Sequence, residues 1–345
     1  MDQKKITEAM HRIEDLYHET DGKCYLSFSG GKDSTVLLVL LKMCQELYTV
    51  GDIPAVFSNT GIELGVTVDF VNWVKENYYH NVQIIRPIKS FDQVTKEYGK
   101  PLKSKMKDKD LSQYHYRTRT EKLLLLLIGQ TGKGKMYAKH KIGDADIHML
   151  HDDFPIKMSN SCCDWMKKKP FEHYTKETGM KGVMLGLRAS EGGARESAMI
   201  TRVKFGGKPC TWMKGKVIQK APIIDWTDED VEDFIRGYNV PLSDAYTKYG
   251  FDRTGCMACP YGMYLTRDLT YLHDHEPNRY KAAMHWLKDV YIAKDVRLPF
   301  DPEYEAERER MWREVYSPMR REMLEKYRPN CRLLKRMNRE QGEAL

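Results

Sequence analysis

The stretch Ser29-Gly30-Gly31-Lys32-Asp33-Ser34 directly follows the apolar run Tyr25-Leu26-Ser27-Phe28. This order predicts a buried strand that runs into a glycine pair and then into a helix beginning near Asp33. Two glycines let the backbone approach a phosphate closely, and the N–H groups at a helix start point at the anion. Lys32 adds a positive charge, Asp33 can hold Mg²⁺ on the phosphate oxygens, and Ser29 and Ser34 add hydroxyl donors. We therefore expect a phosphate loop rather than a plain Gly-Gly turn.

Strands alternate with helices around this loop, which is typical of a parallel sheet in an α/β fold. The expected strands are 24–28, 55–58, 82–88 and 182–187, and the expected helices are 34–47, 67–78 and 164–178. Helix 34–47 is apolar on nearly every face, so we expect it to pack against the sheet. Thr227 is a good N-cap for another helix, with Asp230 three residues later.

The segment from Phe91 to Asp153 interrupts the alternation and is the expected insertion. Beyond Pro260 the sequence becomes helical and rich in Tyr, Trp, Met and Arg. The simplest division is a main domain, 1–262, with a basic insertion at about 91–153, followed by a helical region, 263–345. The aromatic helices at 280–323 could form a dimer face or could simply cover the sheet.

Composition narrows the class of protein. The chain has 345 residues, 30% of them charged, and no apolar run approaches the roughly 20 residues needed to span a bilayer. Its first 20 residues read as a charged amphipathic helix rather than a signal peptide. Eight cysteines without a secretory signal favour cofactor or redox use over disulfides. We expect a cytoplasmic protein with no membrane partner.

The net charge of +7 is unevenly distributed. Twelve Lys or Arg residues lie between Gly99 and Lys141 against three acids, and the stretch 202–220 contains no acid. Further basic residues lie near the end of the chain, at Arg332, Lys335, Arg336 and Arg339. Such stripes suit a polyanion such as nucleic acid or a charged nucleotide, although solvated surface loops can look the same.

Four cysteines form two close pairs, Cys162-Cys163 and Cys256-Met257-Ala258-Cys259, the second bracketed by Gly255 and Pro260. Four thiolates suit a [4Fe–4S] cluster, a Cys₄ zinc site or a redox dithiol, and spacing alone does not separate these. Cys24 and Cys44 are expected to be core residues. Cys331 lies beside arginine in the tail and could be a reactive, exposed thiol.

A second glycine-rich segment, 129–135, has the spacing of a Walker loop but carries Met136 where Ser or Thr would hold Mg²⁺. The run before it looks like an amphipathic helix ending at glycine. We expect a basic loop there, not a second nucleotide site.

SGGKDS resembles the signature of the PP-loop ATP pyrophosphatases, which cleave or hold nucleotides between the α and β phosphates. The pair CC followed by CxxC behind such a loop is similar to the iron–sulfur form of the adenylyl-sulfate and phosphoadenylyl-sulfate (PAPS) reductase family. The resemblance covers roughly Tyr25 to Gly262. It implies a doubly wound, adenine nucleotide α-hydrolase-like parallel sheet with a helical C-terminal appendage.

The resemblance also implies site residues. Ser29, Gly30, Gly31, Lys32, Asp33, Ser34, Asn59, Thr60, Gly61 and Gly186 would bind an adenine nucleotide. Lys32, Asp33, Arg188 and Arg195 would be catalytic, with the arginines facing the anionic end of the ligand. Cys162, Cys163, Cys256 and Cys259 would hold a [4Fe–4S] cluster, the reading that the resemblance favours over zinc. ATP or an adenylyl nucleotide and Mg²⁺ are the other expected cofactors.

One family element is missing, because the reductases carry a C-terminal Glu-Cys-Gly-Leu/Ile-His segment and this tail reads NCRLLKRMNREQGEAL. The DNA-phosphorothioation sulfurtransferases and tRNA thiolases, related PP-loop proteins, instead adenylate an oxygen that sulfur then displaces. Our leading hypothesis is such an ATP pyrophosphatase and sulfurtransferase, acting on a nucleic-acid or nucleotide target, DNA or tRNA among them. The alternatives are a sulfonucleotide reductase that uses Cys331 and a non-catalytic nucleotide sensor. A cysteine desulfurase or an electron donor would be a partner, and a homodimer is one possible assembly.

Overall fold

The computed structural model describes residues 2–131 and 135–342. Contacts divide the chain into two compact units. Unit 1 comprises Met1–Ile88 and Met166–Gly255, and unit 2 comprises Lys89–Trp165 and Cys256–Leu345. The predicted insertion at 91–153 and the helices after Pro260 therefore belong to the same unit.

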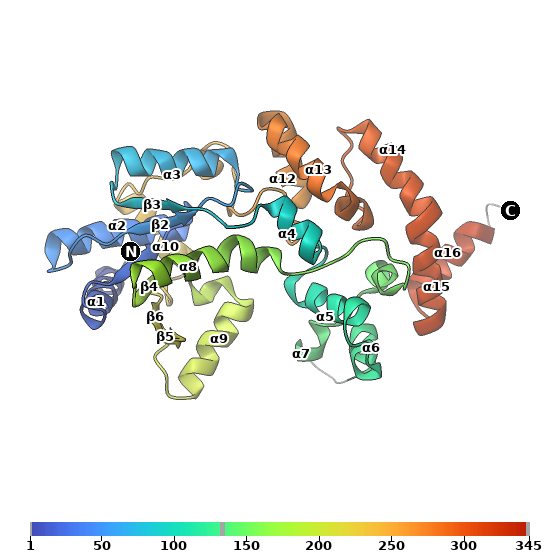
Figure 1. The fold of residues 1–345 in the computed structure, drawn as a ribbon, viewed down its shortest axis with the longest axis horizontal. Helices are drawn as coiled ribbons and strands as arrows, with labels where there is room; N and C mark the ends of the chain where they lie inside the picture. Colours follow the sequence, from blue (N-terminus) through green and yellow to red (C-terminus); the bar gives the residue numbers. More distant parts are fainter. Residues whose placement is uncertain (1, 132–134, 343–345) are drawn as a thin grey trace. The chain divides into compact units, whose positions relative to one another are not determined.

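Unit 1 is built on a six-stranded sheet of order β3-β2-β1-β4-β6-β5 (Figure 1). All neighbours are parallel except the edge pair β5–β6, which is antiparallel. The strands are β1 Cys24–Ser27, β2 Ala55–Ser58, β3 Val82–Ile85, β4 Gly182–Leu185, β5 Thr211–Lys214 and β6 Val217–Lys220. The predicted parallel sheet is confirmed for β1, β2, β3, β4 and β6. Strands β2 and β3 are added on one side of β1 and β4 on the other, so the strand order reverses between β1 and β4.

Helices cover both faces of this sheet. One face packs against α1 (Gln3–Glu19), α2 (Lys32–Leu47), α3 (Gly65–Asn77) and α10 (Asp228–Gly237) in the main hydrophobic core. The other face packs against α8 (Lys169–Thr178), where Tyr25, Val56, Tyr174 and Val183 form a much smaller core. Unit 1 also contains α9 (Gly193–Lys204), α11 (Asp244–Thr247) and the 3₁₀ turn η3 (Ala189–Glu191). The π-helical turn η2 (Asp164–Lys168) spans the boundary between the units in the sequence, with its first two residues in unit 2 and the rest in unit 1.

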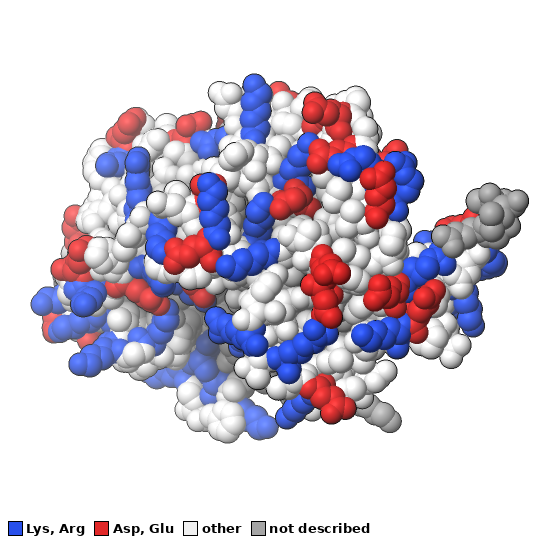
Figure 2. Space-filling view, turned by 45° about the vertical axis from the view of Figure 1, so that its right-hand side comes forward, with Lys and Arg blue, Asp and Glu red and all other residues white. Residues whose placement is uncertain are grey.

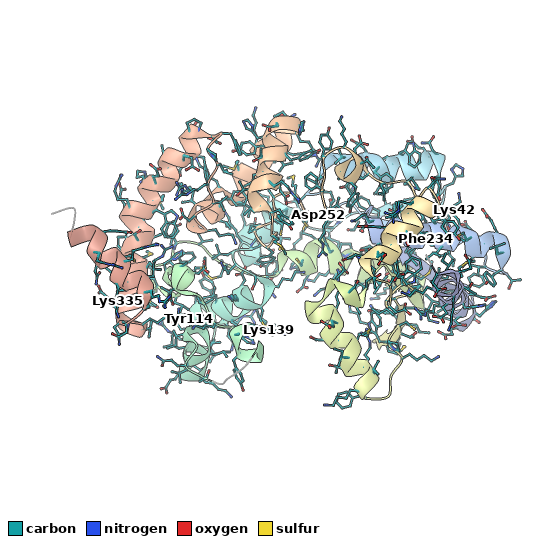
Figure 3. All side chains as sticks on the ribbon, turned by 180° about the vertical axis from the view of Figure 1, so that it is seen from behind. Lys42, Tyr114, Lys139, Phe234, Asp252 and Lys335 are labelled. Atoms are coloured by element: carbon teal, nitrogen blue, oxygen red, sulfur yellow. The ribbon has the colours of Figure 1, made fainter. Side chains whose placement is uncertain are left out.

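The local signals in the sequence hold for several helices. Every residue from Ser34 to Leu41 of α2 is buried, as the all-round apolar pattern predicted. Thr227 caps α10 in a capping box with Asp230, so this prediction is confirmed. Phe234, on the inner side of α10, lies in the main core (Figure 3). Helix α6 (Glu121–Ile128) ends at Gly129 in the left-handed conformation, as expected for a helix rather than a strand.

Other predictions need correction. β3 ends at Ile85 rather than Ile88, because Pro87 has no N–H for the ladder and Ile88 is 73% exposed. β4 ends at Leu185 rather than Leu187, where the Leu187 N–H turns back to the Leu185 carbonyl. The hairpin β5–β6 was not predicted, since its lysines hide the strand pattern. The Walker-like segment 129–135 includes residues 132–134, which lie outside the described residues.

Unit 2 is helical in its described part. It contains α4 (Phe91–Tyr98), α5 (Lys105–Tyr116), α6, α7 (Lys135–Ala138), the 3₁₀ helix η1 (Asp144–Leu150), α12 (Leu265–His275), α13 (Pro277–Ala293), α14 (Pro302–Met311), the π-helical η4 (Trp312–Tyr316), α15 (Ser317–Tyr327) and α16 (Arg332–Gly342). Its core includes Tyr114 of α5 (Figure 3), and His148 of η1 packs on Trp312 and Tyr316. Among the described residues, no helix is both long and apolar enough to cross a membrane.

His148 supplies a test of unit 2 by pH. Burial, and secondarily the charge of Arg320, lowers its pKa to about 4, and its Nε2 lies 3.1 Å from the Ala293 carbonyl. Because the unfolded histidine keeps its usual pKa of 6.5, the unfolded state binds the extra proton, and stability falls as the pH drops from 6.5 towards 4. The expected slope is about 1.4 kcal/mol per pH unit. In urea unfolding, the stability of the wild type should fall over this interval relative to that of His148→Gln, and a constant difference between the two proteins would contradict the assignment.

Candidate functional site

The phosphate loop lies at the carboxyl end of β1, and the strand order of the sheet reverses between β1 and its neighbour β4. Open α/β sheets bind ligands at such a switch point. Gly30 has φ +70°, which favours glycine, and a side chain there would meet Thr67 and Val71 of α3 at 3.1 Å. The predicted loop therefore has a backbone shape that its two glycines make possible.

Hydroxyl groups hold this loop from inside. The Ser34 hydroxyl donates to the Gly31 carbonyl at 2.9 Å and accepts the Ser29 N–H at 3.2 Å. The Gly31 N–H donates to the Ser29 hydroxyl at 3.3 Å. The Tyr246 hydroxyl accepts the Lys32 N–H at 3.3 Å. Backbone N–H groups at the start of a helix are the groups that bind phosphate oxygens in such loops.

Arg188 and Asp33 meet across the switch point. The buried Arg188 follows β4, and its Nε donates to Asp33 Oδ1 at 2.8 Å. Its Nη1 donates to Asp228 Oδ1 at 2.7 Å and to the Ser190 hydroxyl at 2.9 Å. Gly186 makes this approach possible, because a Cβ there would lie 3.0 Å from the Asp33 carbonyl carbon and from the Ser34 nitrogen.

Arg195 lies close enough to Arg188 and Asp33 for their charges to act on it. Burial lowers its pKa, and the charges of Arg253 and Arg188 lower it further, while Asp33 opposes them. Glu191 pairs with Arg195 and also with Arg253, the latter at 3.1 Å. The structure thus brings the four predicted catalytic side chains, Lys32, Asp33, Arg188 and Arg195, to one edge of the sheet, where an anion could replace the carboxylates.

The second predicted nucleotide turn, Asn59-Thr60-Gly61, follows β2 and is held by its own side chains. The Gly61 N–H donates to Asn59 Oδ1 at 3.1 Å. The Thr60 N–H and hydroxyl donate to the two oxygens of Glu63 at 2.9 and 2.7 Å. Asn59 and Gly61 are the more accessible members of the turn, since Thr60 is buried.

A cavity of about 920 Å³ opens beside the loop. Ser29, Ser58, Glu63, Thr67 and Thr254 line the end near the loop, and Tyr25, Phe171, Val183 and Leu185 line its floor on the α8 face of the sheet. Volumes of this order hold nucleotides and other small ligands. Sequence reasoning missed Tyr246, Thr254, Asp228 and Phe171 because none of them belongs to a local motif.

All four paired cysteines lie in unit 2. The pKa of the Cys162 thiol is far above its usual range. Its hydrogen bond with Cys163 is the first cause, burial the second, and the nearby charges of Cys163, Cys259 and Cys256 add to both. The two pairs are therefore close together, although no group of three or more His, Cys, Asp or Glu side chains within 2–131 and 135–342 is already placed to hold a metal.

Two tyrosine hydroxyls hold the second cysteine pair. Ala258, between Cys256 and Cys259, has φ +46°, and its carbonyl accepts the hydroxyl of the fully buried Tyr291 at 2.7 Å. Tyr261 donates to the buried Asp108 at 2.6 Å and lies 3.3 Å from the Ser159 carbonyl. Asp108 also accepts the N–H groups of Leu102 and Lys103. Two of the four thiols, those of Cys256 and Cys259, thus lie on a tightly held turn, and a donor set of four thiols is of the kind that a thiolate-bound metal centre needs.

The remaining cysteines have separate surroundings. Cys24 and Cys44 are fully buried core residues, as expected. Cys331 is half-buried rather than exposed, and its sulfur accepts the Leu334 N–H at 3.3 Å at the start of α16. Cys210 precedes β5, and its sulfur lies 3.5 Å from the Thr211 hydroxyl.

Comparison with known proteins identifies the family. The model of the phosphoadenosine phosphosulfate reductase domain matches residues 23–133 and 112–261, which together are more than half of the chain. The chain therefore belongs to the phosphoadenosine phosphosulfate reductase domain family, and its loop is a PP-loop.

Particular relatives are distant. An uncharacterized protein of Methanocaldococcus jannaschii, MJ0973, is 25% identical over 261 residues, 75% of this chain and 47% of that protein. The chain spans less than half the length of the curated relatives it matches. The PAPS reductase of Candida auris has a TM-score of 0.43 at 14% identity, covering 74% of this chain and 96% of that one. The U34-tRNA thiolase NcsA of Methanococcus maripaludis, solved with its [4Fe-4S] cluster, has a TM-score of 0.37 at 12% identity, covering 83% and 78%.

Gly186→Ala tests the contact between β4 and the loop. The new methyl group would push on the backbone of Asp33 and Ser34, so we expect a lower melting temperature and, in the protein that remains folded, ATP binding weakened at least tenfold by calorimetry. Gly237→Ala is the control, since a methyl group on Gly237 would point into open space. Equal ATP affinity in Gly186→Ala and the wild type would place the nucleotide elsewhere.

Tyr261→Phe tests the support of the cysteine turn. Without its hydroxyl the turn loses its bond to Asp108, so we expect less iron to remain after anaerobic reconstitution with iron and sulfide and subsequent desalting. Tyr280→Phe is a matched control, because it removes a similar bond of 2.6 Å to Asp301, which the structure does not connect to the cysteines. Equal iron retention in both variants would rule out this role for Tyr261.

Proposed function

We propose that this chain is a PP-loop ATP pyrophosphatase and sulfurtransferase, which adenylates an oxygen of a nucleic-acid or nucleotide target and lets sulfur displace it. The observation that carries the proposal is the Asp33–Arg188 pair at the phosphate loop, whose residue Ser29 also lines a nucleotide-sized cavity. Family membership supports the nucleotide chemistry. The cysteine group of unit 2 supports the sulfur chemistry.

In the first step a target oxygen attacks the α phosphorus of ATP. The bond from that phosphorus to the bridging oxygen breaks, and pyrophosphate leaves with the electron pair. Lys32 and the loop amides would bind the phosphates, Asp33 would hold Mg²⁺, and Arg188 and Arg195 would stabilise the charge that develops on the leaving group.

In the second step a sulfide donor attacks the carbon that carries the adenylated oxygen, the carbon–oxygen bond breaks, and AMP leaves with that oxygen and the electron pair. Cys162, Cys163, Cys256 and Cys259 would hold a [4Fe–4S] cluster, which supplies iron that carries soft sulfur ligands. The chain's own contribution here is the tight turn, fixed by Tyr261 and Tyr291, that keeps the thiols together.

A second candidate function follows from the family itself. A sulfonucleotide reductase would release sulfite and would need a thiol nucleophile, for which Cys331 is the tail cysteine. Its sulfur already accepts a backbone N–H at the start of α16, and the tail lacks the family's glycine and histidine. We therefore rank this reaction below adenylation, and a nucleotide sensor without turnover below both.

The deciding experiment measures pyrophosphate from ATP and sulfite from adenylyl sulfate and PAPS, using protein purified without oxygen. We expect pyrophosphate in the presence of tRNA or DNA and no sulfite. Arg188→Gln should lower kcat/KM for pyrophosphate release about 100-fold, whereas Arg236→Gln, an exposed arginine on α10, should not change it. Sulfite that depends on Cys331 would establish the reductase, and ATP binding without either product would leave a sensor.

A further inference from the structure

The acid-free basic stretch 202–220, so far without a role, lies next to the cavity in unit 1. Residues 197–224 contain no Asp or Glu. They form the end of α9, a glycine-containing loop and the hairpin β5–β6. Figure 2 shows one face of the molecule, on which Lys and Arg side chains lie among Asp and Glu side chains.

This stretch also exposes apolar side chains. Phe205 is 80% exposed, and Met213, Ile200 and Val203 are each more than half exposed. Among the described residues of α9 none is buried, so its apolar side chains have no core to enter. Cations beside exposed aromatic and apolar groups are the combination that binds single-stranded nucleic acid, because phosphates meet the cations and bases stack on the rings.

A chain of contacts links this surface to the cavity. The Arg202 guanidinium stacks over the Trp212 ring at 4.2 Å. Trp212 Nε1 in turn donates to Gln219 Oε1 at 2.7 Å, and Gln219 lines the cavity. The turn Lys214-Gly215-Lys216 between the two strands lines it as well. The basic surface therefore adjoins the cavity at the end away from the PP-loop.

The cavity itself has two different ends. The end near the loop carries polar side chains, among them Thr67. This residue is 2% exposed, and its hydroxyl has no hydrogen-bond partner in the part of the chain that the structure describes. Three of the lysines that line the cavity, Lys176, Lys214 and Lys216, lie at the far end. The other two, Lys167 and Lys168, follow Met166, whose carbonyl accepts the Ser58 hydroxyl at 3.3 Å near the loop. Of the two carboxylates that line the cavity, Glu63 holds Thr60 and Glu172 pairs with Lys214 at 2.9 Å.

The floor at the far end is aromatic. The rings of Tyr25 and Phe171 are nearly parallel, with 6° between their planes and 6.0 Å between their centres. Tyr25 lies on β1 and Ser29 lies two residues beyond its end, at most about 13 Å away along an extended chain, so the cavity runs from the phosphate loop along β1. An unpaired base can enter such a space, whereas a base inside a duplex cannot.

We propose that single-stranded nucleic acid is the target, bound across α9 and the β5–β6 hairpin, with one unpaired nucleotide in the far end of the cavity. This inference rests on the proposed function and names its substrate class. The strand's phosphates contact Lys214, Lys216 and their lysine neighbours, and Phe205 stacks on a base outside the cavity.

The test is fluorescence anisotropy of labelled 20-nucleotide RNA and DNA single strands and a 20-base-pair duplex, without ATP, between 50 and 200 mM NaCl. We expect the single strands to bind at least fivefold tighter than the duplex. Lys214→Ala/Lys216→Ala should raise Kd at least tenfold and reduce the slope of log K against log salt by about 1.4, or about 0.7 per lost phosphate contact. Phe205→Ala should raise Kd about tenfold with an unchanged salt slope.

The matched control is Lys4→Ala/Lys75→Ala, two exposed lysines on α1 and α3, which cover the opposite face of the sheet. Equal losses in the two double variants, tighter binding of the duplex, or no binding would each overturn the inference. ATP binding and pyrophosphate release with mononucleotide acceptors are measured separately. Pyrophosphate release with a mononucleotide acceptor, but no binding of single strands, would refute only the inference about the nucleic acid. Binding of single strands without pyrophosphate release from any acceptor would refute the proposed function.

Discussion

The close approach of β4 to the first turn of α2 is the constraint on which the site depends. Gly186 has no side chain, so the backbone after β4 lies against Asp33 and Ser34, and Arg188 reaches Asp33 from there. A buried guanidinium requires partners, and Asp33 and Asp228 provide them. The pair keeps a cation and a carboxylate in place beside the loop amides, which is the arrangement that phosphate and a divalent ion would need.

The division of the chain into two units separates the PP-loop from the paired cysteines. Unit 1 contains the PP-loop, the arginines and the cavity, and unit 2 contains the four paired cysteines. Unit 2 is assembled from two distant segments, and the bond between Tyr261 and Asp108 joins them. The cysteine pairs can therefore come together only when both segments have folded, so the thiol site depends on the tertiary structure of a helical unit rather than on a local metal-binding motif.

The basic residues of the chain have different surroundings in its different parts. Many basic residues of the predicted insertion are paired, for example Lys103 with Asp146 and Lys100 with Asp289, each at 2.8 Å. The stretch 202–220 is free of acids in sequence, and its ion pairs are with other elements: Lys214 pairs with Glu172 of α8, and Lys220 pairs with Asp15 and Glu19 of α1. Sequence counts identified both stretches as basic, but only the folded surface distinguished the one that leads into a cavity.

The sequence by itself determined the PP-loop, the alternation of strands and helices, the cap at Thr227 and the pairing of the cysteines along the chain. These features follow from glycine backbone freedom, hydrophobic periodicity and hydroxyl capping, which act within one or two turns of a helix. Only the tertiary structure decided that Arg188 meets Asp33, 155 positions away, that Tyr246 joins the loop, and that β5 and β6 extend the sheet. The reason is that such contacts depend on strand order and on which segments share a core, and neither leaves a periodic or local signal in the residues involved.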